Sequence, residues 1–376
     1  MDESAHESLL RAFIDMPDPR VNRTKHHYLH DILVITVCSV LAGLEHWTQI
    51  EDYGKANRAW FDTFLDLPNG IPSHDTFGRV FAALDPDEFE VRFQRWTQAL
   101  AGGTKGKHIA VDGKTLRKSF ERASNKVAVH MVSAWGHENH AVFAQVKVDD
   151  KSNEIPAAPK LLAMLDLTDA TVTFDALHCQ RETAAQIIDQ GGHYVMAVKD
   201  NQPTLHADVQ WAFEDAMANG FSGEHDFCER VEKGHGRIET RRCWTSGNIA
   251  WLRDRHQWPG LESICLIERQ RVVGDEQSIE RHYYVSSHPG RCAQRSACVI
   301  RNHWRVENEL HWTLDVAFNE DACRVRVDNA AENLSRVRRI ALMLLKQDKT
   351  CKLGIKSKRA KCGYDRAYLL HVLRLA

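Results

Sequence analysis

The chain has 376 residues, of which 43% are hydrophobic and 27% are charged. These fractions are typical of a folded globular protein and exclude an intrinsically disordered one. The formal net charge is −2, so the chain lacks a strongly basic balance, and any contact with DNA has to come from a local basic patch.

The ten cysteines include no Cys-x-x-Cys pair, and no basic segment followed by an apolar one opens the chain. We therefore expect reduced thiols and a cytoplasmic, nucleoid-associated protein. The most apolar run is residues 32–44. It is shorter than the roughly 20 residues that span a membrane, so it predicts a buried helix and no membrane partner.

Residues 1–100 predict a helical N-terminal domain. Apolar periodicity predicts a helix over 47–64, and after a Pro/Gly turn Ser73 can cap a helix that ends near Leu84. A further helix follows Pro86. A helix, a short turn and a capped helix fit either a DNA-reading helix-turn-helix or plain helix packing. The glycine-rich basic segment 101–107 then predicts a domain boundary.

The rest of the chain, residues 107–376, predicts a second domain of mixed α/β type. Strands are expected at 108–111, 127–135, 142–148, 172–175 and 194–198, and helices at 155–165, 182–188 and 203–217. Three adjacent strands followed by alternating helices and strands is the order of an RNase H-like core. A mainly β insertion of short, irregular strands is expected at 220–297, followed by helices at 298–316 and 328–346.

Two aspartates are predicted to end strands of this domain. Asp112 follows Val111 and precedes Gly113, and Asp175 follows Phe174. Carboxylates at a sheet edge suit the two divalent cations, about 3.5–4 Å apart, that cleave phosphodiesters. Aspartates at strand ends also cap helices and turns, so their position alone leaves both interpretations open.

Glu307 is the third candidate ligand. On an ideal helix Val306, Leu310 and Leu314 form one apolar face, and Glu307 lies at its margin. An ordinary surface glutamate fits the same pattern. His303 and His311, four residues to either side, provide a zinc site as an alternative, although the chain has no His-Glu-x-x-His run here.

Basic residues cluster in two places. Residues 346–366 are rich in Lys and Arg, which favours either a phosphate-binding surface or a solvated helix face. The segment 233–242 combines glycines with Arg237, Arg241 and Arg242, so backbone amides and guanidinium groups there are candidates for phosphate contacts.

Together these motifs resemble the H-repeat-associated proteins, a group of bacterial insertion-sequence transposases with a DDE triad of acidic residues. The resemblance covers nearly the whole chain. It rests on the runs His74–Thr76, Val111–Arg117, Lys151–Ile155, Asp175–Gln180, Ala197–Gln202 and His235–Arg237, and on the long run from His303 to Asp321.

The resemblance implies a multi-domain α/β protein with an RNase H-like catalytic core, a β insertion between the second Asp and the Glu, and C-terminal helices. It makes Asp112, Asp175 and Glu307 the catalytic residues and metal ligands. The implied cofactor is Mg²⁺, with Mn²⁺ as a substitute. The implied partners are double-stranded DNA, as element ends and target, and a second copy of the chain when DNA is bound. Our candidates for phosphate contacts are Arg117, Lys199, Arg237 and Arg305.

One departure concerns the Tyr, Arg, Glu, Lys signature of many related transposases. The corresponding residues here are Ile300, His303, Glu307 and Leu314, and the nearest cations are Arg301 and Arg305. The H-repeat-associated group usually has this altered form. Two alternatives stay open: a nuclease that cuts DNA without joining strands, and an inactive DNA-binding remnant.

Overall fold

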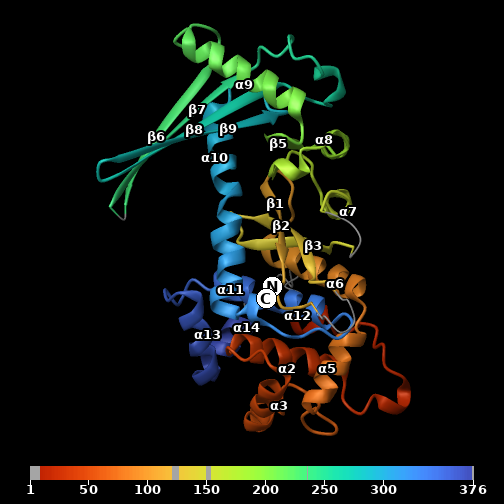
Figure 1. Ribbon diagram of the computed structural model, residues 1–376. Helices are drawn as coiled ribbons and strands as arrows, with labels where there is room; N and C mark the ends of the chain where they lie inside the picture. The colour runs from red at the N-terminus through yellow and green to blue at the C-terminus, as the bar shows by residue number, and fades with distance from the viewer. Residues whose placement is uncertain (1–8, 121–126, 150–153, 235, 375–376) are drawn as a thin grey trace, which may run out of the picture.

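A mixed sheet of nine strands runs through the middle of the protein in the computed structural model, which describes residues 9–120, 127–149, 154–234 and 236–374 (Figure 1). The strands are β1 (His108–Thr115), β2 (His130–Gly136), β3 (Ala141–Lys147), β4 (Thr171–Phe174), β5 (His193–Val198), β6 (Asp226–Gly234), β7 (Arg237–Ser246), β8 (Ser263–Val273) and β9 (Glu276–Ser286). The mixed α/β class predicted from the sequence is confirmed.

The strand order in the sheet is β3-β2-β1-β4-β5-β9-β8-β7-β6. Strands β1, β4 and β5 are parallel to one another, and every other neighbouring pair is antiparallel. The predicted β insertion is more regular than its sequence indicated. It forms long hairpins that join the central sheet through pairing of β9 with β5 and extend it at one end of the molecule (Figure 1).

The helices precede, connect and follow these strands. They are α1 (Leu9–Ala12), α2 (Leu29–Leu41), α3 (Trp47–Ala56), α4 (Arg58–Phe61), α5 (His74–Ala83), α6 (Pro86–Ala101), α7 (Ala157–Leu162), α8 (Arg181–Asp189), α9 (Pro203–Ala218), α10 (Ala293–His303), α11 (Trp312–Phe318), α12 (Ala330–Gln347), α13 (Ile355–Tyr364) and α14 (Arg366–Arg374). Among the described residues no helix combines the length and the apolar character needed to cross a membrane.

Local signals explain where several of these helices begin. Ser73 caps α5 by accepting a hydrogen bond from the Thr76 amide. Asp85 caps α6 by accepting hydrogen bonds from the Asp87 and Glu88 amides. The first residue of this helix, Pro86, has no backbone N–H that would need a partner. The helix predicted over 47–64 is instead divided between α3 and α4 at Asn57, whose backbone and side chain both bond to the Tyr53 carbonyl.

Helix α12 joins the two ends of the chain. It is buried along nearly its whole length and packs against α2, α5 and α6 of the N-terminal part (Figure 1). Its arginines find internal partners, since Arg336 pairs with Glu90 of α6 at 2.8 Å and Arg339 with Glu320 at 3.0 Å. The N-terminal helices therefore share their core with the C-terminal helices as well as with the sheet.

Helix α10 connects the hairpins to the rest of the molecule. It packs against β1, β4 and β5 of the central sheet and also against β6, β7 and β8 of the hairpins. In Figure 1 it runs from the hairpins to α11 at the level of the N-terminal helices. The segment that follows α10 carries Glu307, so this helix brings that residue back to the central strands.

Candidate functional site

Asp112 and Asp175 lie next to each other, Asp112 on β1 and Asp175 directly after the parallel strand β4. The ladder between β1 and β4 ends at the pair Val111 and Phe174, and the two aspartates are the next residues. Asp112 does not end its strand as the sequence predicted, because pairing with β2 continues β1 to Thr115 and sets Asp112 opposite Ser133. Only the β4 side of the pair has the expected strand-end geometry.

Asp175 also caps a short helix. Its Oδ1 accepts a hydrogen bond from the Leu177 amide at 3.1 Å, at the start of the 3₁₀ turn Ala176–His178. The capping role that competed with the ligand role in the sequence is thus present. It occupies one carboxylate oxygen and fixes the direction of the side chain, so capping and ligand roles are compatible.

Glu307 begins a π-helical segment, Glu307–His311, that separates α10 from α11. The continuous helix predicted over 298–316 is therefore wrong at this point. Val306, Leu310 and Leu314 are buried as the ideal helix predicted, and Glu307 is exposed. The wider turn offsets the residues before it from those after it, and such turns are frequent at functional sites.

The carboxyl group of Asp112 lies close enough to Asp175 and Glu307 to be repelled by their negative charges. Burial raises its pKa to about 7, and repulsion from Asp175, Glu307 and Glu154 adds to this, whereas the Gly113 amide opposes it. The three predicted acids and Glu154 therefore form one negatively charged site around Asp112.

Glu154 is a member of this site that our sequence reasoning did not assign. Its carboxylate oxygens lie 2.7 Å from His130 Nε2 and 3.1 Å from His178 Nε2. Contacts with the two histidines lower its pKa to about 2. The sequence signal for Glu154 was its place in the run Lys151–Ile155, which is part of the family resemblance. Lys151, Ser152 and Asn153 of this run, and His235 of the run His235–Arg237, lie outside the described residues.

Gly113 is required where Glu154 meets β1. A Cβ atom at this position would lie 2.5 Å from Glu154 Oε2 and 2.6 Å from His130 Nε2, which is closer than non-bonded atoms approach. A glycine, which has no Cβ atom, admits a close neighbour at this position. The neighbour within the chain is the Glu154 carboxylate.

Two further histidines support the site from inside. His311 Nδ1 lies 3.5 Å from Asp112 Oδ2, and His303 Nδ1 lies 3.0 Å from the Thr173 hydroxyl on β4. Burial lowers the pKa of His303 to about 4 and that of His311 to about 3, so both are neutral at pH 7. They contact different strands, which does not support the zinc site considered for His303, Glu307 and His311.

The triad carboxylates are neighbours without converging on one point. Among the described residues, one group of three possible ligand atoms lies within 4.8 Å of one another, and it consists of His137, His140 and Glu309. Wider spacing of the triad is compatible with two cations about 3.5–4 Å apart, because the acids then share two coordination shells.

The four predicted phosphate contacts are not all brought to this site. Lys199 follows β5, which is parallel to β4, so it lies at the same sheet edge as Asp175. Arg305 pairs with Glu309 at 2.8 Å and Arg117 with Asp321 at 3.1 Å. Arg237 lies at the hairpin end of β7, which extends on the order of 20 Å past the central strands at 3.3 Å per residue.

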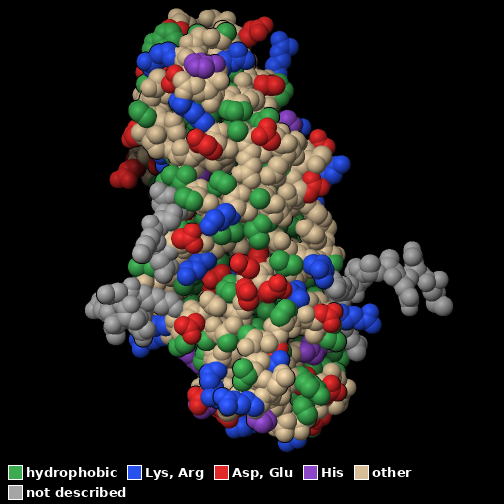
Figure 2. Space-filling view, turned by 90° about the vertical axis from the view of Figure 1, so that its right-hand side faces the viewer, with side chains coloured by type: hydrophobic (Ala, Val, Ile, Leu, Met, Phe, Trp, Pro, Cys, Tyr) green, Lys and Arg blue, Asp and Glu red, His purple; other side chains and the backbone are tan. Residues whose placement is uncertain are grey.

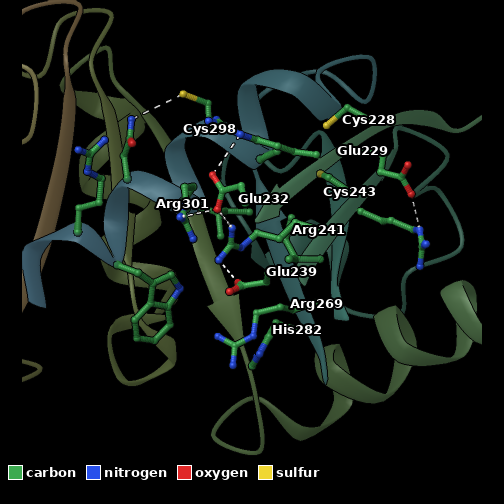
Figure 3. Close-up of a pocket in the computed structure, with 18 of the residues that line it drawn as sticks. Cys228, Glu229, Glu232, Glu239, Arg241, Cys243, Arg269, His282, Cys298 and Arg301 are labelled. Carbon is green, nitrogen blue, oxygen red and sulfur yellow. Dashed lines mark hydrogen bonds and ion pairs between the residues drawn. The ribbon is translucent and has the colours of Figure 1, made fainter. Parts of the chain in front are cut away.

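A cavity of about 1400 Å³ is lined by residues of the hairpins, of α10 and of the segment that follows it. Figure 3 shows its basic and acidic side chains pointing toward one another. Arg241 lies 2.6 Å from Glu232 and also pairs with Glu239, and Arg301 lies 2.9 Å from Glu232. Arg237 and Arg305 line the same cavity, which therefore connects the two otherwise separate candidates.

The basic C-terminal segment is partly internal, which corrects both interpretations of it. Lys358 is buried and donates to the carbonyls of Leu345 and Asp348 at 2.8 and 2.6 Å. Arg359 is buried over the Phe318 ring and bonds to the Val40 carbonyl. Exposed cations remain at Lys349, Lys352 and Lys356.

Charge on the surface is mixed. On the face drawn in Figure 2, acidic side chains gather near the middle of the molecule, with Lys and Arg side chains around them. This agrees with the formal net charge of −2. The Lys and Arg side chains on this face lie as local groups among acidic ones.

Comparison with known proteins groups the chain with transposases. The family model described as "Transposase DDE domain" matches residues 103–344, and the one described as "DDE_Tnp_1-associated" matches residues 10–97. The "Putative transposase YncI" of Escherichia coli O157:H7 is 41% identical over 371 residues, which cover 98% of this chain and 94% of that protein. The "H repeat-associated putative transposase YhhI" of Escherichia coli K12 is 40% identical over 363 residues, 95% of each chain.

One solved structure is also similar in outline. The cryo-EM structure of the piggyBac transposase synaptic complex with hairpin DNA gives a TM-score of 0.45 at 10% sequence identity, covering 96% of this chain and 76% of that one.

Proposed function

Because the chain belongs to the family of transposases with a DDE domain, and has H-repeat-associated relatives, we propose that it cuts DNA at the ends of an insertion sequence and joins the freed strands to target DNA. The observation that carries the proposal is that Asp112 and Asp175 are the residues that follow the last pair of the parallel ladder between β1 and β4, with Glu307 close enough to act on the charge of Asp112. Such an activity would take place on chromosomal DNA in the cytoplasm, at the nucleoid.

We also propose that β1–β5 and their helices form an RNase H-like core. In support, β1, β2 and β3 form an antiparallel meander, and β4 and β5 add to β1 in parallel. The proposed units are a helical domain over 1–100 and a catalytic domain over 107–376. The latter would include the insertion at about 220–297 and the basic segment at about 328–376.

The residues fit magnesium. Asp112, Asp175 and Glu307 offer hard carboxylate oxygens, which Mg²⁺ and Mn²⁺ prefer, and no soft ligand. The three carboxylates repel one another, and this repulsion contributes to the raised pKa of Asp112. A bound cation would offset that repulsion. Bound there, two Mg²⁺ ions would supply a deprotonated attacking oxygen and a stabilised leaving oxygen.

The residues of the chain would orient this chemistry. The cap on Leu177 holds Asp175, and His311 lies against Asp112. The two contacts of Glu154, one with His130 and one with His178, hold its carboxylate beside Gly113. Lys199, Arg117, Arg237 and Arg305 are proposed to contact DNA phosphates, with the last two acting from the cavity of Figure 3.

The test is cleavage and joining of DNA that carries the element ends, with Mg²⁺, using isosteric variants of the triad. We expect Asp112→Asn, Asp175→Asn and Glu307→Gln each to lower the rate of strand cleavage by about 1000-fold or more while DNA binding is kept. The matched control is Asp149→Asn, since Asp149 is an exposed carboxylate paired only with Lys160 among the contacts described. This variant should cut and join DNA at the wild-type rate.

Other outcomes distinguish the alternatives. Cutting without joined product by the wild type favours a nuclease that has lost strand transfer. Full activity in any one triad variant removes that residue from the site. A wild-type protein that binds the ends but neither cuts nor joins them in Mg²⁺ or Mn²⁺ favours a DNA-binding remnant.

A further inference from the structure

His137, His140 and Glu309 form a compact cluster outside the triad. The two histidines occupy the turn between β2 and β3, and Glu309 is part of the π-helical segment. Glu309 Oε2 lies 2.9 Å from His137 Nδ1 and 3.4 Å from His140 Nδ1. Within the described part of the chain, no other three His, Cys, Asp or Glu side chains bring ligand atoms within 4.8 Å of one another.

These separations match the edges of a small coordination shell. With bonds of about 2.0–2.1 Å to nitrogen or oxygen, two ligands of a tetrahedral zinc ion lie about 3.4 Å apart. Two imidazoles and a carboxylate make a donor set that zinc binds well and that Mg²⁺ does not favour. All three side chains are part-buried, with exposed fractions of 16%, 31% and 18%, so a fourth position is left for water.

The hydrogen bonds around the cluster leave this role open. His137 Nδ1 is within hydrogen-bonding distance of Glu309 Oε2, at 2.9 Å, and a bound cation would replace this contact. His140 Nδ1 is buried, lies 3.4 Å from the same oxygen and makes no hydrogen bond within the described residues. Arg305 binds the opposite carboxylate oxygen, Oε1, at 2.8 Å, so Oε2 still faces the histidines. His140 holds a positive φ of 49°, an uncommon conformation for a residue with a side chain.

We infer that His137, His140 and Glu309 bind a zinc-class divalent cation at a site separate from the triad. The cation would tie the turn between β2 and β3 to the segment that begins with Glu307. The turn is otherwise held by Asn139, whose amide donates to the Ala101 carbonyl and whose carbonyl accepts from Gln347. The site thereby links Glu307 to a fixed point on the sheet.

Zinc binding to the full chain tests this inference without DNA or catalysis. The protein is freed of metal with a chelator and titrated with Zn²⁺ in a large excess of Mg²⁺, against a chromogenic chelator. We expect one equivalent of Zn²⁺ that Mg²⁺ does not displace. His137→Ala and His140→Asn should each weaken this binding by about 100-fold or more. Co²⁺ in place of Zn²⁺ should give the absorption of a four-coordinate ion in the wild type and in neither histidine variant.

Two controls separate this site from other ligands. His206→Ala removes a histidine that lies 3.3 Å from Asp200 and should keep the zinc equivalent. Asp112→Asn with Asp175→Asn should also keep it, although that protein cannot cut DNA. Circular dichroism verifies that each variant is folded, and Glu309→Gln replaces either histidine variant that is not.

The inference is overturned if the wild type binds no Zn²⁺ in excess Mg²⁺, or if the histidine variants bind it as tightly as wild type. It is also overturned if only the double Asp variant loses it, because the metal would then occupy the triad. Failure of the zinc site leaves the proposed cleavage reaction untouched, since that assay depends on other residues.

Discussion

Asp112 carries a charge that the fold makes costly. Its side chain is 21% exposed, and burial together with three neighbouring carboxylates raises its pKa to about 7. The folded protein therefore holds a proton on this group that the unfolded chain releases near pH 4. Between these two values the folded state loses stability as pH rises, and above pH 7 the whole cost is present. A residue under such a penalty is expected where a cation is bound.

Replacing this charge should stabilise the metal-free protein. In a chelator at about pH 8, Asp112→Asn is expected to raise the free energy of unfolding by about 1–2 kcal/mol, less than the full pKa shift would give because the group is partly solvated. At about pH 4 the gain should vanish, since the carboxyl is then neutral in the folded state. Urea unfolding at both pH values measures it. A gain of equal size at both would show that the charge of Asp112 is not its cause.

At the scale of elements, the π-helical segment and helix α12 determine which side chains reach the sheet. The π turn that begins at Glu307 contains one residue more than an α-helical turn. This extra residue changes the direction of Glu307 relative to the apolar residues Leu310 and Leu314. On the N-terminal side α10 is anchored through His303 and Thr173. Because His303 is fixed on one side of Glu307 and the buried Leu310 and Leu314 are fixed on the other, the extra residue determines the orientation of Glu307.

Deleting Asn308 should therefore convert this segment to α-helix and turn Glu307 by about 100° relative to Leu310 and Leu314. We expect DNA cleavage to fall by about 100-fold or more, while the helical circular dichroism signal stays close to wild type. Cleavage and unfolding are measured on the same preparation. Asn308→Ala, which keeps the residue count, should stay within about threefold of the wild-type rate, and a deletion variant that cuts normally would contradict this account.

Lys356 and Lys358 allow surface and internal cations to be separated. Lys358 is buried and donates to two carbonyls at the end of α12, whereas Lys356 is exposed. Lys358→Met should lower the free energy of unfolding by about 1–3 kcal/mol, because the two carbonyls lose their donor. Lys356→Ala should leave stability unchanged. If it contacts a phosphate, the slope of DNA affinity against salt should fall by about 1, and fluorescence anisotropy at several salt concentrations checks this.

For the whole molecule, the elongated arrangement separates the hairpins from the helices that join the chain ends (Figure 1). Helix α10 and the cavity of Figure 3 lie between them, and the ion pair of Arg301 on α10 with Glu232 on β6 joins the two sides of this cavity. Each chain offers one copy of the proposed triad Asp112, Asp175 and Glu307. The proposed reaction at two element ends would therefore require a second copy of the chain or a second round of binding.

We predict that two copies assemble on a pair of DNA ends. Light scattering of the purified complex should give the mass of two chains, each of 42.9 kDa, with two end duplexes. Mixing wild type with the Asp112→Asn variant should then lower joining of both ends more steeply than in proportion to the wild-type fraction. A stable complex of one chain with two ends, fully active, would refute the dimer.

Several features could be predicted from local sequence alone. The cap at Ser73, the strands around Asp112 and Asp175, and the buried face of Val306, Leu310 and Leu314 depend on residues close in the chain. The membership of the transposase family was also visible, because its motifs are local runs. Each of these features is determined by residues that lie within about one helical turn or one strand of each other in the chain.

Other features were decided by residues far apart in the sequence. Pairing of β1 with β2 extended the strand past Asp112. The approach of Glu154 to Gly113 made a fourth acid part of the site. Burial of Lys358 removed a cation from the predicted basic surface, and the turn between β2 and β3 met Glu309. Which distant side chains share a site depends on sheet register and packing, and these arise only when the whole chain buries its apolar surface together.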